Sequence, residues 1–290
     1  MTMTTLTTPP KSSDLVKFPA FRSYEKSRQL SNNAMMGLLA GSQLSAHFLQ
    51  LTQGSNQILS RIFPNVPHIG RFDLTSESAS EVLRNADSHL GNMAVPLVLA
   101  MHEDMLRTSA EILKEEGMCT SAQASANLVN LHGNISSATG KIYSPDMLSY
   151  IDTLRLMRNS LIHSGGKASA ALVNSLSSWN DNMTEGWKTI TKRNPKNIAI
   201  NDVIDFRHGE MIAALAFTKR LDRETNVFLS MSVPRQTWIR YIVDETSDMQ
   251  KNILRGNPKL ALKKASGIAR TYYPSLQVTK QELQEEIDRR

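Results

Sequence analysis

The sequence predicts an all-α protein, and three observations support this fold class. Apolar residues recur at spacings of three and four along most of the 290 residues, which is the period of a helix with one buried face. The chain contains 14 Met, and only 6% of its residues are aromatic, a composition that suits an adaptable aliphatic helical core better than a β-sandwich. Alternating patterns typical of β-strands are scarce. We therefore expect a helical bundle.

Composition and charge exclude several classes of protein. Hydrophobic residues make up 40% and charged residues 21% of the chain, which excludes bulk disorder and collagen-like structure. The formal net charge is +6, a mild bias whose placement matters more than its size. The single cysteine, Cys119, excludes an intramolecular disulfide framework. Since the chain also lacks a long apolar run and a secretory signal pattern, we expect a cytoplasmic protein with no membrane span.

The first part of the chain is expected to contain an arm and a helical segment. Residues 1–30 are rich in Thr, Ser and Pro, which is typical of a flexible N-terminal arm. Apolar residues recur at helical spacing over residues 33–63 and predict one long or two short helices. These helices would form an N-terminal helical segment over residues 31–75.

The helices of the middle of the chain have recognisable start and stop signals. Ser78 and Glu81 have the spacing of a capping box and predict a helix to about residue 116, which Pro96 would kink or divide. The pattern is weaker over residues 117–143, where we expect at most a short helix.

A sharper helix signal follows at Ser144, where a Ser N-cap, a Pro at the first helical position and an Asp predict a helix to His163. Gly165 and Gly166 supply its glycine stop. A shorter helix over residues 168–177, a polar connection and a helix from Asn201 complete this part.

A basic helical extension is expected over residues 235–290. Apolar spacing predicts a helix over residues 238–253, and Thr279 and Glu282 have capping-box spacing at the start of a final helix. Six basic residues and no acidic residue lie between them, over residues 251–273. They could contact nucleic-acid phosphates, or they could form a solvated helical face. These candidate nucleic-acid-binding residues are Lys251, Arg255, Lys259, Lys263, Lys264 and Arg270.

An unusual group of polar residues lies near the end of the helix that is predicted to begin at Ser144. Arg158 falls on the line of its apolar stripe, so its guanidinium should face a carboxylate, a phosphate or a polar cleft between subunits. Asn159 and His163 are four residues apart and share a neighbouring helix face. A purely structural alternative has Arg158 in a salt bridge, Asn159 in a local cap and His163 as a cation favoured by the helix dipole.

The segment from Leu156 to Gly166 resembles the R-N-x-x-x-H signature of the HEPN superfamily, the all-helical domains of RNA-cleaving toxins and antiviral effectors. The likeness covers about residues 80–230 and implies a HEPN-like helical domain over residues 76–234. It implies a metal-independent endoribonuclease that acts on single-stranded RNA in a toxin or antiviral role, with no cofactor and with two protomers joining their motifs in a homodimer or higher homo-oligomer.

The resemblance also implies a role for each residue of the motif. His163 would act as general base or acid toward the ribose 2′-hydroxyl, because an imidazole titrates near neutrality. Arg158 would hold the scissile phosphate with its planar fork, and Asn159 would orient the imidazole or a phosphate oxygen. A regulatory partner protein is compatible with this interpretation.

The alternative function is a non-catalytic helical protein that binds nucleic acid or forms oligomers through the basic C-terminal segment. Of the seven His residues, only His163 lies in a constellation that indicates chemistry. The others are expected to be packing or surface residues. His102 precedes a Glu, but the second His of a zinc-protease helix is missing, so we expect no metal site there.

Overall fold

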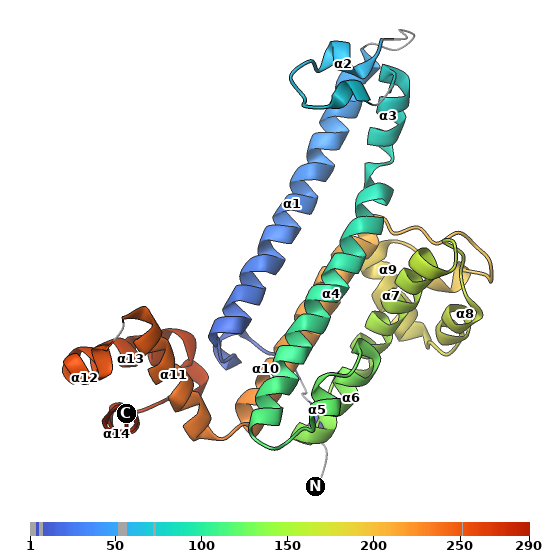
Figure 1. Ribbon diagram of the computed structural model, residues 1–290. Helices are drawn as coiled ribbons and strands as arrows, with labels where there is room; N and C mark the ends of the chain where they lie inside the picture. The colour runs from blue at the N-terminus through green and yellow to red at the C-terminus, as the bar shows by residue number, and fades with distance from the viewer. Residues whose placement is uncertain (1–3, 6–7, 52–56, 72–73, 251) are drawn as a thin grey trace. The chain divides into compact units, whose positions relative to one another are not determined.

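The computed structural model describes residues 4–5, 8–51, 57–71, 74–250 and 252–290 (Figure 1). These residues form fourteen α-helices, four 3-10 helices and two strands of two residues each, Thr4–Thr5 (β1) and Lys141–Ile142 (β2), which pair in parallel. The prediction of an all-α protein is confirmed. None of the described helices combines the length and the apolar character needed to cross a membrane.

The chain divides into two compact units, and each consists of segments that are far apart in the sequence. The first contains Met1–Ser27, Leu99–Asp152 and Ala216–Arg290, and the second contains Arg28–Val98 and Thr153–Leu215. This division differs from the consecutive segments expected from the sequence, because long helices contribute to both units. These helices are α1 (Pro19–Gln50), α4 (Ala86–Glu115), α7 (Pro145–His163) and α10 (His208–Ser232).

The remaining helices each belong to one unit. Those of the first unit are η1 (Ser12–Asp14), α5 (Ser121–Ala124), α6 (Leu128–Thr139), α11 (Arg235–Met249), α12 (Ile253–Gly256), α13 (Pro258–Tyr272), η4 (Pro274–Leu276) and α14 (Lys280–Asp288). Those of the second unit are α2 (Leu59–Ile62), η2 (Ile69–Arg71), α3 (Ser76–Arg84), α8 (Ala170–Ser177), α9 (Asp181–Thr191) and η3 (Pro195–Asn197).

The N-terminal segment is built into the core of the first unit. Leu15, Val16 and Phe18 are at most 1% exposed, and α1 begins at Pro19, whose missing N–H suits the first helical position. The side-chain amide of Asn226 exchanges two hydrogen bonds of 2.8 Å with the backbone of Val16. The expectation of a flexible arm over residues 1–30 is therefore wrong from Leu15 onward. The composition of residues 1–30 is dominated by Ser, Thr and Pro, so it did not indicate that a few apolar residues of this stretch are buried.

The C-terminal helices are also part of the first unit's core. Helices α11, α13 and α14 pack against one another, and Trp238 and Tyr273 are fully buried. The ring of Phe18 lies 5.8 Å from that of Trp238, so the N-terminal segment contributes to the same core. The predicted capping box at the start of α14 is confirmed, because the Thr279 and Glu282 side chains each accept a hydrogen bond from the other's backbone N–H.

The start of α4 differs from the predicted helix. Thr75, rather than Ser78, caps α3, and the helix breaks at Asn85. Pro96 lies inside α4 and does not end it. Gly91 allows α4 to approach the 205–207 segment closely, because a Cβ atom there would lie 2.2 Å from the Phe206 carbonyl oxygen.

The segment after α8 contains a helix, α9, where the sequence predicts a polar connection. The Asn180 side chain accepts a hydrogen bond from the Met183 backbone N–H at 2.9 Å, which caps α9. Trp187 anchors this helix with 1% exposure. Helix α10 begins at His208 instead of Asn201. Asn201 lies in a turn with a φ of 70°, and backbone hydrogen bonds join residues 201–204 to residues 166–168, which follow α7.

Candidate functional site

The C-terminal end of α7, in the second unit, carries the three residues of the R-N-x-x-x-H motif. Arg158 and Asn159 are partly buried, and His163, the last residue of the helix, is exposed. The Arg158 Nη1 group donates a hydrogen bond of 3.0 Å to the Asn159 side-chain oxygen. The His163 imidazole makes no hydrogen bond or ion pair with any residue that the structure describes. The structure thus pairs Arg158 with Asn159 and leaves the imidazole facing solvent.

The guanidinium of Arg158 has few partners. Its Nε atom is buried and has no hydrogen-bond partner among the described residues. Within the same residues, no carboxylate lies within ion-pair distance of Arg158. The structural alternative for Arg158, a salt bridge to a neighbouring helix, is thus not present among the described residues. A partly buried Arg without a carboxylate is suited to an anionic ligand, because the planar fork matches phosphate oxygens.

Hydrogen bonds on both sides hold the turn that follows His163. Gly165 and Gly166 have φ values of 60° and 77°, a left-handed conformation that favours glycine. The Gly166 N–H donates to the Ser160 carbonyl at 3.1 Å and closes the helix, which confirms the predicted glycine stop. The Gly166 carbonyl accepts a bond of 2.7 Å from the Ile204 N–H. The end of α7 therefore has a defined position within its unit.

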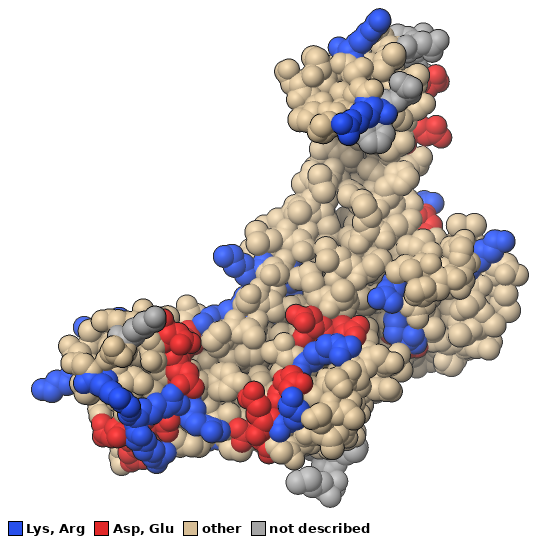
Figure 2. All heavy atoms as spheres, in the orientation of Figure 1, with Lys and Arg blue, Asp and Glu red and all other residues tan. Residues whose placement is uncertain are grey.

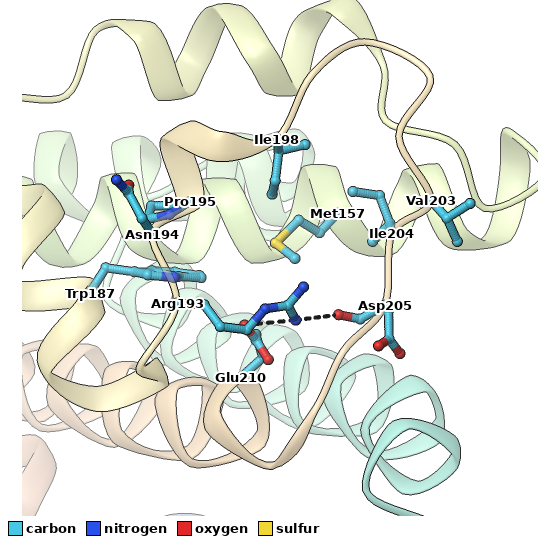
Figure 3. Close-up of a pocket in the computed structure, with 10 residues that line it drawn as sticks. All are labelled: Met157, Trp187, Arg193, Asn194, Pro195, Ile198, Val203, Ile204, Asp205 and Glu210. Atoms are coloured by element: carbon cyan, nitrogen blue, oxygen red, sulfur yellow. Dashed lines mark hydrogen bonds and ion pairs between the residues drawn. The ribbon is translucent and has the colours of Figure 1, made fainter. Parts of the chain in front are cut away.

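A small cavity lies beside α7 in the same unit (Figure 3). The Arg193 side chain extends between Asp205 and Glu210 and donates to the Asp205 carbonyl at 2.9 Å and to the Glu210 carboxylate at 3.4 Å. Burial raises the pKa of Glu210 above its usual range. The cavity volume is about 40 Å³, enough for a water molecule but not for a nucleotide.

Three of the six candidate nucleic-acid-binding residues share one exposed face of α13. Lys259, Lys263 and Arg270 are spaced by four and seven residues and lie on that face. None of their side chains makes a hydrogen bond or ion pair with another described residue. Figure 2 shows Lys and Arg side chains over the C-terminal helices, interspersed with Asp and Glu. We call Lys259, Lys263 and Arg270 the basic face of α13.

The other three candidates differ from this face. The Lys264 ammonium donates to the Gln250 side chain at 2.8 Å, and the Arg255 guanidinium donates to the Arg290 backbone carbonyl at 3.1 Å. Lys251 lies outside the described residues. The basic face belongs to the first unit and the α7 motif to the second.

A buried polar network in the first unit was not anticipated from the sequence. The His102 Nδ1 atom lies 2.7 Å from an Asp222 carboxylate oxygen, and its Nε2 atom lies 3.0 Å from Nε2 of His132. The Tyr24 hydroxyl donates to the other oxygen of Asp222. The imidazole of His132 meets the ring of Tyr143 edge-on, at 5.0 Å between centroids. Four helices, α1, α4, α6 and α10, thus meet through polar side chains.

The contacts of the two imidazoles assign one donor. The His102 Nδ1–H donates to the Asp222 carboxylate, whereas either Nε2 atom can supply the single proton of the His102–His132 contact. Burial lowers the pKa of His132 well below its usual value, and the neighbouring His102 lowers it further, so His132 stays neutral. Among the residues that the structure describes, no group of three or more His, Cys, Asp or Glu side chains is arranged to hold a metal ion.

The sequence contained a signal for part of this network. His102 lies on the buried stripe of α4, in line with Val95, Leu99 and Leu106, a spacing that marks a buried imidazole. Asp222 had no such signal, because it stands in a polar run that resembles a solvated helix face.

Comparisons of this chain with protein-family models, with curated proteins and with solved structures find no match. Its function is therefore inferred from the geometry of the α7 motif and of the basic face of α13.

Proposed function

We propose that this protein is a metal-independent endoribonuclease of HEPN type that cleaves single-stranded RNA in toxin or antiviral defence. One observation carries the proposal. Arg158, a guanidinium with no carboxylate partner among the described residues, and His163, an exposed imidazole, stand five residues apart at the end of one helix. A cation for the phosphate and a group that titrates near neutrality are the two elements that this cleavage requires.

The reaction uses the RNA itself as nucleophile. The ribose 2′-oxygen attacks the adjacent phosphorus as its proton passes to an imidazole, and the bond from phosphorus to the 5′-oxygen breaks. The leaving oxygen takes a proton from an acid, which leaves a 2′,3′-cyclic phosphate and a 5′-hydroxyl. Arg158 would stabilise the charge that develops on the phosphoryl oxygens, and Asn159, which accepts a hydrogen bond from Arg158, would orient the guanidinium.

The proposed reaction calls for a homodimer. It needs both a base and an acid, and each motif offers only one imidazole. Two copies of α7 facing one another would supply both groups. Ile162, beside His163, is 52% exposed, an apolar side chain that a contact between two copies would cover.

The test is cleavage of single-stranded RNA in EDTA by the full chain and two variants. We expect His163→Ala and Arg158→Ala each to lower the cleavage rate by about 10² to 10⁴, the usual contribution of such groups, without loss of folding. His47→Ala, which removes an exposed His from α1, is the matched control and should cleave at the wild-type rate. RNA with a 2′-deoxy nucleotide at the cleavage position should remain intact. Wild-type rates in both motif variants would refute the proposal.

The second candidate is a non-catalytic helical protein that binds nucleic acid through the basic face of α13. The free cations of that face favour it. If these three side chains contact phosphates of a single strand, log K should fall against log salt with a slope of about −2. The triple variant Lys259→Ala, Lys263→Ala, Arg270→Ala should lose this dependence. Protein that binds RNA in this way but cuts none would favour the second candidate over the first.

A further inference from the structure

Helix α1 carries two rows of apolar and small residues on different sides. Each row alternates spacings of four and three residues, the seven-residue period at which two long helices stay in contact along a seam. The first row is buried and consists of Met35, Leu39, Ser42, Ala46 and Leu49. The second row is exposed and consists of Leu30, Ala34, Gly37, Gly41, Leu44, Phe48 and Leu51, the last directly after the helix. We call the second row the exposed seam, and all of it belongs to the second unit.

The exposed seam is large enough for an interface. Its four large side chains and the neighbouring Leu38 are each between 51% and 81% exposed. With about 150 to 250 Å² for one fully exposed side chain of this size, these side chains together expose roughly 600 Å². A second copy that covers them with the same surface would bury up to about 1,200 Å² in total, and a specific interface needs about 1,000 Å². An exposed apolar patch of this size marks an interaction site.

No charged residue interrupts the exposed seam. Residues 29–60 contain no Lys, Arg, Asp or Glu. In a contact between two copies related by a twofold axis, residues near the axis face their own counterparts, so a charge there would meet a like charge. A helix that lies on a membrane surface usually has Lys or Arg beside its apolar face, and these side chains contact anionic headgroups. A face without charge therefore fits a second copy of the chain better than a membrane.

After Leu30, the exposed seam has a small half and a large half. A Cβ atom at Gly37 or Gly41 would meet nothing within 4 Å, so packing within the chain does not require glycine at either position. Glycine inside a helix nevertheless costs stability relative to alanine. Close approach by large side chains of another helix accounts for both glycines. The small half is Ala34, Gly37 and Gly41, and the large half is Leu44, Phe48 and Leu51.

We propose that two copies of this chain pair through the exposed seam, with their α1 helices antiparallel. In one antiparallel register, each residue of the large half lies opposite a residue of the small half of the second copy, so that the two surfaces interdigitate. A parallel pair would instead bring glycine against glycine and Phe48 against its own counterpart, with a void in one half and crowding in the other. The facing pairs of the antiparallel register are Leu51 with Ala34, Phe48 with Gly37, and Leu44 with Gly41. This contact differs from the α7 contact and does not depend on the proposed RNA cleavage.

Sedimentation equilibrium of the full chain tests the proposal in an Ile162→Glu background, which removes a contact through α7. We expect a monomer–dimer equilibrium at protein concentrations up to about 100 μM. Leu44→Glu should raise the dissociation constant of the dimer about 100-fold, because it places carboxylates in an apolar contact. The matched control is Val129→Glu, which adds the same charge at an exposed apolar position of α6 and should leave the dimer intact.

An exchange of a large and a small residue tests the facing pairs. Gly41→Leu adds a side chain in open space on the monomer, yet it should raise the dissociation constant about tenfold, because it collides with Leu44 of the second copy. The double variant Gly41→Leu, Leu44→Ala should recover most of the lost affinity.

Three results of these measurements would overturn the proposal. They are a protein that stays monomeric, a dimer that Leu44→Glu leaves unchanged, and a dimer that Gly41→Leu tightens, as a non-specific apolar contact would. A monomer that binds phosphatidylglycerol vesicles would assign the exposed seam to a membrane surface and overturn the proposal as well.

Discussion

The end of α7 and the middle of α10 are two short polar runs that differ in burial and in hydrogen bonding. In α10, Asp222, Glu224 and Asn226 are at most 1% exposed, and each bonds to side chains or backbone from other segments. At the end of α7, His163 is exposed and has no partner among the described residues. Polar groups whose bonds are satisfied inside the protein hold the fold, whereas those left without partners are available to a ligand.

The α10 run acts as a connector within the first unit. Asp222 reaches α1 and α4, while Glu224 accepts hydrogen bonds from the backbone N–H and hydroxyl of Ser144, at the start of α7. Thr225 bonds to the Tyr143 hydroxyl at 2.8 Å. The Asn226 side chain accepts a hydrogen bond from the Val16 backbone N–H and so binds the N-terminal segment. The comparison with α7 therefore predicts that changes in α10 reduce stability and that changes in the motif leave it intact.

The largest expected effect comes from Asn226→Leu. This substitution leaves the buried N–H and C=O of Val16 without partners, so the free energy of unfolding should fall by about 3 kcal/mol. Urea unfolding followed by circular dichroism measures it. His163→Ala should change the same quantity by less than about 0.5 kcal/mol. A large loss of stability in His163→Ala would contradict the comparison.

A smaller effect is expected from pH, through His132. The folded protein holds its pKa well below the value of about 6.5 expected in the unfolded chain, so below pH 6.5 the unfolded state binds more protons. The stability that the neutral His132 contributes should therefore be fully present above pH 6.5, and it should be lost as the pH falls below that value.

The midpoint of thermal unfolding between pH 7 and pH 5 checks this dependence. His132→Phe should flatten it, because the group that takes up the proton on unfolding is gone. His163→Ala is the matched control and should keep the wild-type slope. An unchanged slope in His132→Phe would show that His132 does not cause the acid sensitivity.

The smallest effect is expected at Glu282, on the surface of the C-terminal helices. A hydrogen bond from Arg235 and one from the Thr279 backbone lower the pKa of Glu282 to about 2. Its contribution is present above about pH 4.5 and should be lost as the pH falls toward 2. Because the pair is exposed, Glu282→Gln should lower the free energy of unfolding at pH 7 by about 0.5 kcal/mol, measured by urea unfolding. A loss as large as that of Asn226→Leu would contradict the ranking.

Local patterns in the sequence predicted several elements well. The helix that ends at His163, its glycine stop and the capping box of α14 depend on residues within one or two turns of each other, so they are readable along the chain. The positions of α9 and of the start of α10 were missed. At the start of α10, backbone hydrogen bonds between residues 201–204 and residues 166–168 keep this stretch out of the helix.

The candidate site was predictable only in part. The sequence identifies Arg158, Asn159 and His163 as a motif. It does not show that no carboxylate of the described residues lies near Arg158, because that depends on how the helices pack. The basic residues between 251 and 273 looked equivalent in the sequence. Only three of the described ones are free, because Lys264 and Arg255 have partners from other segments.

The sequence by itself determined that this protein is helical, where several of its helices end and which residues form its motif, because these properties depend on neighbours in the chain. Only the tertiary structure decided which polar residues are buried and satisfied. Asp222 is buried against Tyr24 and His102, which lie 198 and 120 positions away in the chain, whereas the His163 imidazole has no partner among the described residues. Periodicity does not record such contacts.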